Sequence, residues 1–530
     1  MTGSLRARAF AGFLPLCLVA AACGGDDSSS ASSGTVDSGV KSGVDQALSG
    51  SATTAEITDQ PTSMEEWEAL WAEERAAVVA EITENGWGKS ADGNTLTGPE
   101  GFTVDLAACP AGWSDTEGLT DTTIKIGNTL SQSGTTADYG YLAVAIRPLL
   151  AHYSAEGAFT DSEGKTRTVD YITKDDAYDP ARTIPLVDEL IDSDKVFDVW
   201  TLGSPNTMKT YDKLNQRCIP GILQMTGHPA WGDPVNHPWT TGMQMAYNTE
   251  AVLWGGFIEQ RLDELAPDGG TVKVAALVMN NDFGKSYDAA FKDYLAQSPH
   301  KDRIEYVTEL IEPQVPTVKD PLTTIASQDP DVFIVMSTGV PCTQSITEAS
   351  ENGLKESADY MFMSSVCQSS GFVGKEKVGG DGSATTGWWI VGGGVKDLVS
   401  PDNDGDPFIE WSRELLTNDG TDYTVSGSLT SGIYFGWSMV QALRIAGDLP
   451  GGLTRTNLIL AARAMDMTHP SLIPGIQFNM NGNADAYFVE GSQFGQYDAE
   501  LQNWVTQGDI IDLSGKSANC AWDQSTSTCT

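Results

Sequence analysis

The sequence predicts an α/β protein with two doubly wound parallel sheets. From residue 124 onward, short apolar runs alternate with segments of helical periodicity, and this alternation breaks at 238–242 and then restarts. Strands that alternate with helices favour parallel sheets whose ligand-facing loops follow the carboxyl ends of the strands. The 530 residues suffice for two or three domains. Two such sheets in one chain predict a binding cleft between two lobes.

Each expected element rests on its hydrophobic period: apolar runs of strand length, or apolar residues every three or four positions. In the first unit the expected strands are 124–130, 167–174, 196–202 and 219–225, separated by helices at 139–156, 180–191 and 207–217. In the second unit the expected strands are 272–279, 332–337 and 360–364, and the expected helices are 250–265, 286–296 and 343–352.

The composition excludes several classes of protein. The 31 Lys and Arg against 72 Asp and Glu give a net charge of −41, and such an acidic surface repels the phosphates of nucleic acids. The five histidines do not pair at HxH or HExxH spacing, which disfavours a zinc enzyme with histidine ligands. We therefore expect no nucleic-acid partner, no metal and no cofactor.

The N-terminus indicates an exported protein. Two arginines precede an apolar stretch at 9–22 that is too short for a transmembrane span and is typical of a signal peptide. Small residues precede Cys23 and polar low-complexity sequence follows it, which resembles a bacterial lipobox, although the preferred Leu is Ala20 here. We expect residues 1–22 to be removed and Cys23 to be lipidated. Ordinary signal cleavage beside an incidental cysteine is the alternative.

A tether and a helix are expected before the first sheet. Residues 23–62 are rich in Ser, Gly, Thr and Asp, a composition typical of a flexible tether. An N-terminal helix and extension follow at 63–123, and the helix begins with a capping box at Ser63 and Glu66. Its apolar residues recur at helical spacing: Trp67, Trp71, Val78 and Ile82. We favour a helix that docks on the chain's own body over one that binds a partner.

Several motifs resemble a known family. They are IKIG at 124–127, SQSG at 131–134, DYG at 138–140, DDAYDP at 175–180, GSPNT at 203–207, NDFG at 281–284 and SGIY at 431–434. In this order they resemble type I periplasmic binding proteins of the leucine/isoleucine/valine class, from about residue 124 to 513. The resemblance implies two Rossmann-like lobes joined by a three-strand hinge, with crossings near Gly242, Ile390 and Phe478. Lobe one would be 124–242 plus 391–478, lobe two 243–390 plus 479–513, and a C-terminal tail 514–530.

The resemblance and the strand ends together suggest a ligand site. Ser204, Asn206 and Thr207 follow a strand and open a helix, where hydroxyls and backbone N–H groups suit a carboxylate or another acceptor. Thr226, Gly227 and His228 end the next strand and should lie beside this loop. The resemblance adds the residues Tyr139, Phe283, Thr338, Gln368 and Tyr434. For all of these, helix capping or ordinary core packing is the alternative.

Two departures from the family bear on the ligand. Gly227 stands where the amino-acid binders have a hydroxyl for the ligand carboxylate, and the segment 366–368 holds no acid where they have a Glu for the ammonium. A buried ammonium without a carboxylate is costly. A free branched-chain amino acid is therefore disfavoured, and an amide, a urea-like solute or an aromatic acid stays open. Asp138 or Asp282 could substitute for the missing acid, which keeps the amino acid open as well.

The cysteines predict disulfides. Of the eight cysteines, six remain after removal of the signal peptide and lipidation of Cys23, and cysteines of an exported protein usually pair. Many connectivities are formally open. The lobe assignment, which the resemblance supplies, favours the pairs Cys109–Cys218, Cys342–Cys367 and Cys520–Cys529. A metal or redox role for Cys342 and Cys367 at the cleft end is the alternative, but these two cysteines lack the CxxC spacing.

Two function classes follow from these observations. The first is an extracytoplasmic solute-binding lipoprotein of an ABC importer: a monomer, not an enzyme, lipid-anchored to the bacterial cell membrane, which captures a small amino acid, amide or related acid and delivers it to a permease. The second is a secreted hydrolase with a carboxylate pair, which the count of acidic residues leaves open, although no GxSxG motif is present. A ligand sensor on the same fold is a third reading.

Overall fold

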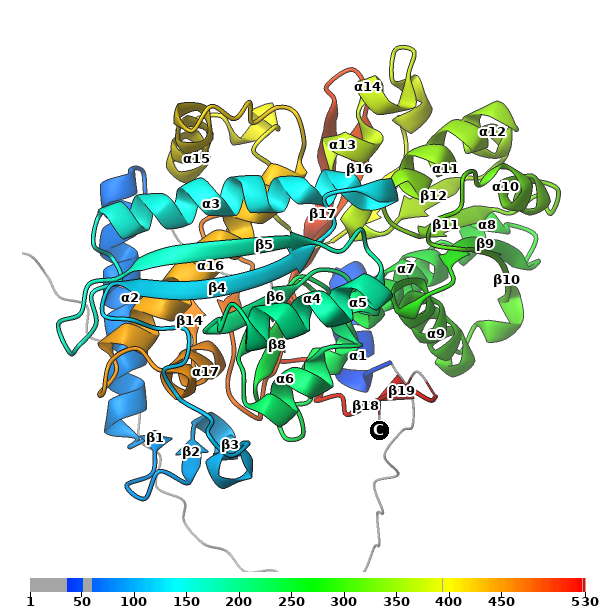
Figure 1. The fold of residues 1–530 in the computed structure, drawn as a ribbon. Helices are drawn as coiled ribbons and strands as arrows, with labels where there is room; N and C mark the ends of the chain where they lie inside the picture. The colour runs from blue at the N-terminus through cyan, green and yellow to red at the C-terminus, as the bar shows by residue number, and fades with distance from the viewer. Residues whose placement is uncertain (1–35, 51–59, 393, 527, 530) are drawn as a thin grey trace, which may run out of the picture. The chain divides into compact units, whose positions relative to one another are not determined.

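The computed structural model describes residues 36–50, 60–392, 394–526 and 528–529. Its first sheet contains parallel strands in the order β5-β4-β6, and a bridge between Leu202 and Met225 links it to a parallel pair, β7 and β8. We call this sheet and the helices around it lobe one (Figure 1). Its strands are β4 (Thr123–Leu130), β5 (Thr168–Asp175), β6 (Asp198–Thr201), β7 (Gly221–Gln224) and β8 (Thr240–Gly242).

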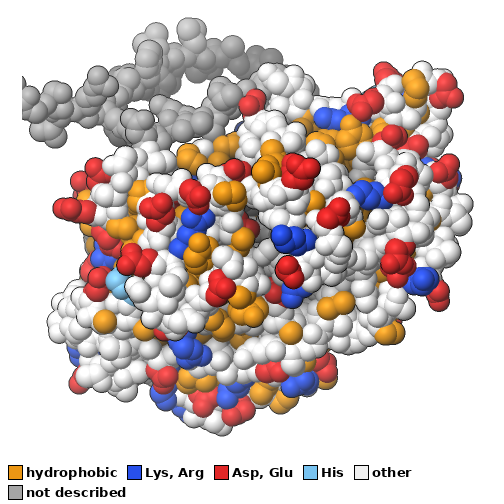
Figure 2. Space-filling model, turned by 90° about the horizontal axis from the view of Figure 1, so that it is seen from above, with side chains coloured by type: hydrophobic (Ala, Val, Ile, Leu, Met, Phe, Trp, Pro, Cys, Tyr) orange, Lys and Arg blue, Asp and Glu red, His pale blue; other side chains and the backbone are white. Residues whose placement is uncertain are grey.

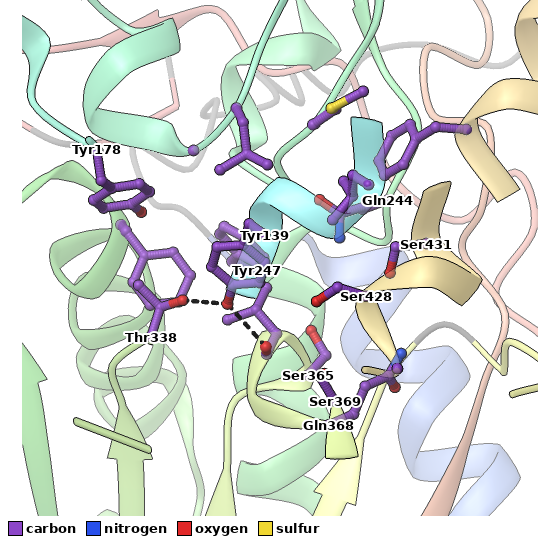
Figure 3. A pocket seen from close by; sticks show the side chains of 18 residues that line it. Tyr139, Tyr178, Gln244, Tyr247, Thr338, Ser365, Gln368, Ser369, Ser428 and Ser431 are labelled. Atoms are coloured by element: carbon purple, nitrogen blue, oxygen red, sulfur yellow. Dashed lines mark hydrogen bonds between the residues drawn. The ribbon is translucent and has the colours of Figure 1, made fainter. Parts of the chain in front are cut away.

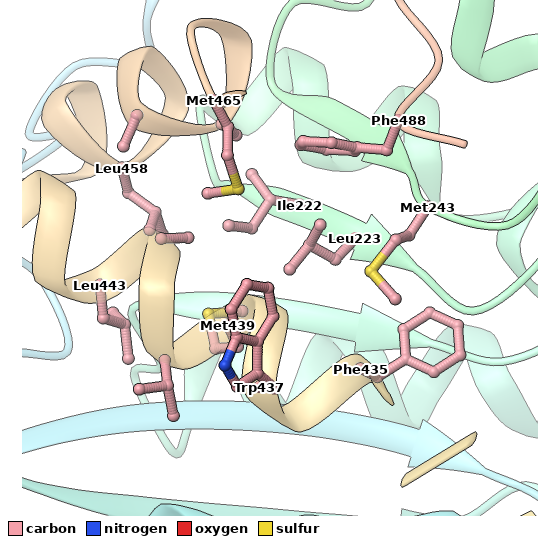
Figure 4. Packing of buried hydrophobic residues seen from close by; sticks show 14 of the residues in the cluster. Ile222, Leu223, Met243, Phe435, Trp437, Met439, Leu443, Leu458, Met465 and Phe488 are labelled. Carbon is pink, nitrogen blue, oxygen red and sulfur yellow. The ribbon is translucent and has the colours of Figure 1, made fainter. Parts of the chain in front are cut away.

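Helices cover both faces of this sheet: α3 and α16 pack against each other on one face, and α4 and α6 form a separate core cluster on the other. The helices of lobe one are α3 (Gly140–Ala155), α4 (Pro180–Asp192), α5 (Ser204–Thr207), α6 (Tyr211–Arg217), α15 (Pro407–Asn418), α16 (Ser428–Asp448) and α17 (Arg455–Arg463). A Cβ on Gly432 of α16 would lie 2.5 Å from the carbonyl oxygen of Leu142, so this glycine lets α16 approach α3 closely. Leu443 and Trp437 of α16 pack toward Ile222 and Leu223 of β7 in the core (Figure 4).

The second sheet has seven strands in the order β10-β9-β11-β12-β13-β16-β17, and we call it and its helices lobe two. The first five strands are parallel, and the last two join them in antiparallel fashion. The strands are β9 (Val272–Met279), β10 (Ile304–Ile311), β11 (Val332–Met336), β12 (Tyr360–Met363), β13 (Trp389–Val391), β16 (Ser492–Asp498) and β17 (Asn503–Ile511). The helices are α7 (Tyr247–Gln260), α8 (Leu262–Leu265), α9 (Asp282–Gln297), α10 (Lys319–Ala326), α11 (Val340–Glu351), α12 (Leu354–Ser357), α13 (Ser370–Val373) and α14 (Lys375–Val378).

The chain passes between the lobes three times. It leaves lobe one after β8, which ends at Gly242, and returns after β13, which contains Ile390. The third passage lies between β15 (Phe478–Asn479), which pairs with β14 (Asp466–Met467), and β16. Phe488 and Val489 still pack in the core of lobe one, whereas Phe494 packs in lobe two. The third passage therefore falls some ten residues later than the position near Phe478 suggested by the resemblance.

The described part of the expected tether is not extended chain. Residues Ser38–Leu48 form helix α1, which the side chain of Asp37 caps and which packs on α7. Val36, Val40 and Val44 are buried on one face, and the site of a Cβ on Gly256 lies 2.8 Å from Val44. The valines recur every four residues and so form an apolar stripe on one face of the helix. This stripe was not predicted from the sequence, because the segment is otherwise rich in Ser and Gly. Residues 23–35 and 51–59 lie outside the described residues.

The expected N-terminal helix is present as α2 (Met64–Glu84), capped by Ser63. Trp67 and Trp71 are fully buried, and Trp71 meets the ring of Trp437 at 5.2 Å. Its indole nitrogen donates to the carbonyl of Thr468 at 3.1 Å. The helix therefore docks on lobe one, as we favoured. The extension after α2 continues through the short strands β1 (Gly88–Lys89), β2 (Thr95–Thr97) and β3 (Thr103–Asp105).

Three disulfides join Cys109 to Cys218, Cys342 to Cys367, and Cys520 to Cys529, the pairs that the lobe assignment favoured. The second ties the loop after β12 to α11, and the third closes the hairpin of β18 (Trp522–Asp523) and β19 (Thr528–Cys529).

No helix within the described ranges is long and apolar enough to cross a bilayer. Figure 2 shows acidic side chains spread over one face, with lysines and arginines between them rather than gathered into a basic patch.

Most expected elements are present, with ends within about three residues. The helix expected at 207–217 is instead two helices, α5 and α6, and the helix expected at 250–265 divides into α7 and α8. Strand β10 was not predicted. Buried and exposed residues do not alternate regularly along β10, because it is the edge strand of its sheet.

Candidate functional site

A cavity of about 70 Å³ lies between the two lobes. Its wall is formed where strands of both sheets end, the position at which ligands bind in open α/β sheets. The lining residues are Tyr139, Leu142, Tyr178, Leu202, Gly203, Met225, Gln244, Tyr247, Phe283, Thr338, Ser365, Val366, Gln368, Ser369, Gly427, Ser428, Ser431 and Phe435. None of these eighteen side chains carries a charge.

One side of the cavity is aromatic, and Figure 3 shows the rings of Tyr139, Tyr178 and Tyr247 there. Tyr139 precedes α3 in lobe one, but its hydroxyl reaches two partners in lobe two. It donates to the carbonyl of Val366 at 3.0 Å and is hydrogen-bonded to the hydroxyl of Thr338. Burial raises the pKa of Tyr139, so the phenol remains protonated at physiological pH. Tyr139 therefore connects the lobes across the cavity.

Tyr178 enters the cavity from an unusual backbone turn. Ala177 and Tyr178 both have positive φ, at 52° and 61°, and the Asp176 carboxylate accepts from the Tyr178 N–H at 2.9 Å. A Cβ on Gly203 would lie 2.2 Å from the Tyr178 ring, so glycine at this position makes room for the ring. Burial raises the pKa of Asp176 to about 6.

Tyr247 explains the first departure from the amino-acid binders. Its N–H donates to the carbonyl of Gly227 at 2.7 Å, and a Cβ on Gly227 would lie 2.7 Å from the Tyr247 ring. The aromatic ring thus occupies the space that a hydroxyl side chain at position 227 would need. On its other face Tyr247 stacks on Tyr287 at 4.6 Å.

The opposite side of the cavity is polar and uncharged. Gln244, Ser365, Ser369, Ser428 and Ser431 lie on this side in Figure 3. The side-chain amides of Gln244 and Gln368 make no hydrogen bond to another described residue. Both amides therefore have donor and acceptor capacity for a ligand.

Asp138 lies behind the polar side. Its Oδ2 accepts hydrogen bonds from Ser369 at 3.0 Å, Ser426 at 2.8 Å and Ser428 at 2.7 Å. Ser369 belongs to lobe two, whereas Ser426 and Ser428 precede and open α16 in lobe one. Asp138 therefore joins the lobes at a second point, beside Tyr139.

A second carboxyl group, that of Glu250 on α7, supports the wall from behind. The Tyr287 hydroxyl donates to it at 2.6 Å and the Ser365 N–H donates to it at 2.7 Å. Burial raises the pKa of Glu250 to about 8, so the group is protonated at neutral pH. It positions Ser365 and the Tyr287 ring that stacks on Tyr247.

We expect Glu250 to make stability depend on pH. Between about pH 4.5 and 8 the folded protein keeps a proton on Glu250 that the unfolded chain releases. Because the folded state then binds more protons, the free energy of unfolding falls as pH rises through this window. Relative to Glu250→Gln, the wild type should lose about 2–4 kcal/mol between pH 5 and 8, as measured by denaturant unfolding. Glu305→Gln, at an exposed residue, is the matched control; parallel curves for wild type and Glu250→Gln would contradict the assignment.

Four of the sequence-predicted site residues line the cavity: Tyr139, Phe283, Thr338 and Gln368. The others lie outside its lining. Ser204 shares a hydrogen bond with Thr226 at 2.8 Å, and Thr207 is bonded to Thr201 and to the carbonyl of Gly203.

The remaining predicted residues likewise have partners within the protein. The amide nitrogen of Asn206 donates to the carbonyl of Leu202 at 3.0 Å. His228 packs on Trp522 at 4.6 Å, and burial lowers its pKa to about 3. Tyr434 packs on His469 at 4.6 Å.

Sequence reasoning missed Tyr178, Tyr247, Gln244, Ser365 and Ser428. Tyr178 had a signal, because it lies inside the DDAYDP motif, whose Asp176 caps the turn. Tyr247 and Gln244 gave no such signal. They follow the first passage between the lobes, where the sequence shows neither a hydrophobic period nor a family motif.

Residues 123–492 match a family model described as periplasmic binding protein. No curated protein matches the sequence. Among solved structures, the chain is similar to a fatty acid ABC transporter substrate-binding protein from Thermomonospora curvata, at 16% identity and a TM-score of 0.61, over 77% of this chain and 98% of that one.

Two further structures are similar. One is a branched-chain amino acid ABC transporter protein from Thermus thermophilus with bound valine, at 15% identity and a TM-score of 0.58, over 74% of this chain and 97% of that one. The other is a solute-binding protein from Rhodopseudomonas palustris HaA2 in complex with p-hydroxybenzoic acid, at 16% identity and a TM-score of 0.56, over 74% and 98%. At these identities the likeness shows the fold, and it confirms the predicted fold class.

Proposed function

Because the chain belongs to the periplasmic binding protein family, we propose that it captures a small solute between its lobes and delivers it to the membrane permease of an ABC importer. The observation that carries this proposal is the uncharged cavity whose wall comes from both lobes and which Tyr139 spans by its bonds to Thr338 and Val366. A solute held in such a place contacts both lobes at once, so its binding free energy favours the closed arrangement.

The size of the cavity supports a hinge. At about 70 Å³ it has roughly half the volume of an apolar cavity that accepts benzene, about 150 Å³. A solute the size of an amino acid therefore requires the lobes to separate before it enters. The three passages between the lobes are the segments about which such a motion would occur.

A thermal-shift screen of amino acids, amides and aromatic acids tests the proposal. A ligand at concentration L that binds the folded state stabilises it by RT ln(1 + L/Kd), so the transition temperature rises with the logarithm of the ligand concentration above Kd. We expect at least one compound to raise it, with saturable binding in calorimetry and no chemical change of the compound. Turnover of a bound compound would favour the hydrolase instead, although no carboxylate belongs to the cavity lining. A ligand sensor would show the same binding but no dependence of uptake on the protein.

Anchoring through Cys23 is part of the proposal, and this cysteine lies outside the described residues. We expect Cys23→Ala to move the protein from the membrane to the soluble fraction, because no helix of the described chain could span a bilayer. Fractionation followed by immunoblotting measures this, with Cys109→Ala as the control that changes a cysteine but keeps the anchor. Membrane association of Cys23→Ala would contradict lipidation at this residue.

A further inference from the structure

Asp138 places an unbalanced negative charge beside the cavity. Three serine hydroxyls donate to its carboxylate, and no ion pair to it forms within the described residues. Lys209 pairs with Asp282 at 3.8 Å, and Lys377, which lines a neighbouring hollow together with Asp138, forms no ion pair with it. The polar side of the cavity therefore has a carboxylate one hydroxyl away and no cationic side chain in its own lining.

The hydrogen-bond directions make two serine oxygens on this side acceptors only. A serine hydroxyl has one proton, and Ser369 and Ser428 give theirs to Asp138. Their oxygens therefore present only lone pairs to the cavity.

Thr338 is constrained in the same way. Tyr139 uses its single proton on the Val366 carbonyl, which can only accept. The bond between Tyr139 and Thr338 must then be donated by Thr338, so its oxygen also presents lone pairs alone. Three oxygens of the wall, from both lobes, are thus acceptors.

From these directions we infer that the site takes a carboxylate-free nitrogen donor, an amide or an amine, with an apolar body. The N–H groups would meet the oxygens of Ser369, Ser428 and Thr338, and the body would lie against the tyrosine rings. A carboxylate offers only acceptors, so it would face these three oxygens and the charge of Asp138. It would find protons only at uncharged groups, such as the amides of Gln244 and Gln368 and the hydroxyl of Ser431, and no cationic side chain in the lining. The inference rests on the proposed function and narrows it to a class of solute.

Free amino acids fail on the same grounds. Their ammonium suits the acceptors near Asp138, but the cavity lining supplies no Lys, Arg or His for their carboxylate. A charge buried without a partner is costly. An amide instead pairs its donor and its acceptor with the amides of Gln244 or Gln368.

A matched series separates these chemistries. Benzamide, benzylamine and benzoate share a phenyl group, and isovaleramide, isoamylamine and isovalerate share an isobutyl group. Leucine and phenylalanine serve as the zwitterions with similar side chains. Calorimetry at pH 7.5 and constant salt gives each Kd. We expect the tightest binder to be an amide or an amine, with its carboxylate partner and the amino acids at least tenfold weaker. If the amine binds more tightly than the matching amide, part of its affinity comes from the negative charge of Asp138.

Variants test the role of Asp138. Asp138→Asn should reduce the preference for the amide or amine over the matching carboxylate at least tenfold. Asp282→Asn, which removes the carboxylate that pairs with Lys209, should leave it unchanged. If Asp138→Asn does not fold, as its thermal transition would reveal, Ser428→Ala removes one acceptor and should weaken amide binding about tenfold.

The inference is overturned if the tightest binder is a carboxylate, an amino acid or a compound without an N–H donor, or if folded Asp138→Asn keeps the wild-type preference. In those cases solute binding itself still stands. If neither this series nor the broader screen yields a binder to the folded protein, the proposed function fails as well.

Discussion

Replacing Tyr139 by alanine should weaken solute binding at least about thirtyfold, which corresponds to about 2 kcal/mol. Two losses add up in this variant. The cavity loses an aromatic wall, and the closed arrangement loses the two bonds that join the lobes through Val366 and Thr338. The variant should fold, because Tyr139 is only half-buried. Calorimetry with the compound found by screening measures the affinity, and the thermal transition measures the fold.

Two controls separate the contributions. Tyr139→Phe keeps the ring and removes the hydroxyl, so it should cost about 1–3 kcal/mol by leaving the Val366 carbonyl without its donor. The double variant Ser204→Ala with Thr207→Ala removes hydroxyls that are bonded inside lobe one, and it should bind normally with reduced stability. Normal binding by Tyr139→Ala, or strong loss in the double variant, would move the site to the loop at 203–207.

Trp71→Ala should lower the free energy of unfolding by about 3–5 kcal/mol, the range for removal of a large aromatic side chain from a core. The Trp71 ring is fully buried between Trp67, Trp437 and Phe408. The change leaves a cavity under α2 and removes the donor to the Thr468 carbonyl. Guanidinium unfolding followed by circular dichroism measures the effect.

The exposed residue Glu73 on the same helix provides the control. Glu73→Ala should change stability by no more than about 0.5 kcal/mol. An equally small effect of Trp71→Ala would mean that α2 does not dock on lobe one in solution and would restore the alternative of a helix that binds a partner.

The fold could be predicted from the sequence because buried strands and amphipathic helices have different periods. Strand β9 was predicted to the residue, since both faces of the sheet around it are covered and its sequence is apolar except for Lys273. Helix α1 could not be predicted, because the three valines of this segment lie among many Ser and Gly residues. They are buried only by packing on α7, which lies more than two hundred residues later in the chain.

The site was only partly predictable, because position after a strand does not fix where a side chain points. The hydroxyls of Ser204 and Thr207 stand at the expected strand end, but local acceptors use them. Tyr139 and Thr338 were found through motifs and strand ends, whereas their mutual bond depends on how two lobes meet. The acceptor character of Ser428 depends on Asp138, nearly three hundred residues away.

The central claim is that a solute binds between the lobes, against the tyrosine rings on one side and the serine and amide groups on the other. A crystal structure of the protein with the tightest compound of the matched series tests this most directly. The account predicts the compound between Tyr139 and Tyr247 on one side and Gln244 and Ser428 on the other, with an N–H group within hydrogen-bond distance of the Ser428 or Thr338 oxygen. A compound bound outside the space between the lobes, or held there by a carboxylate, would contradict it.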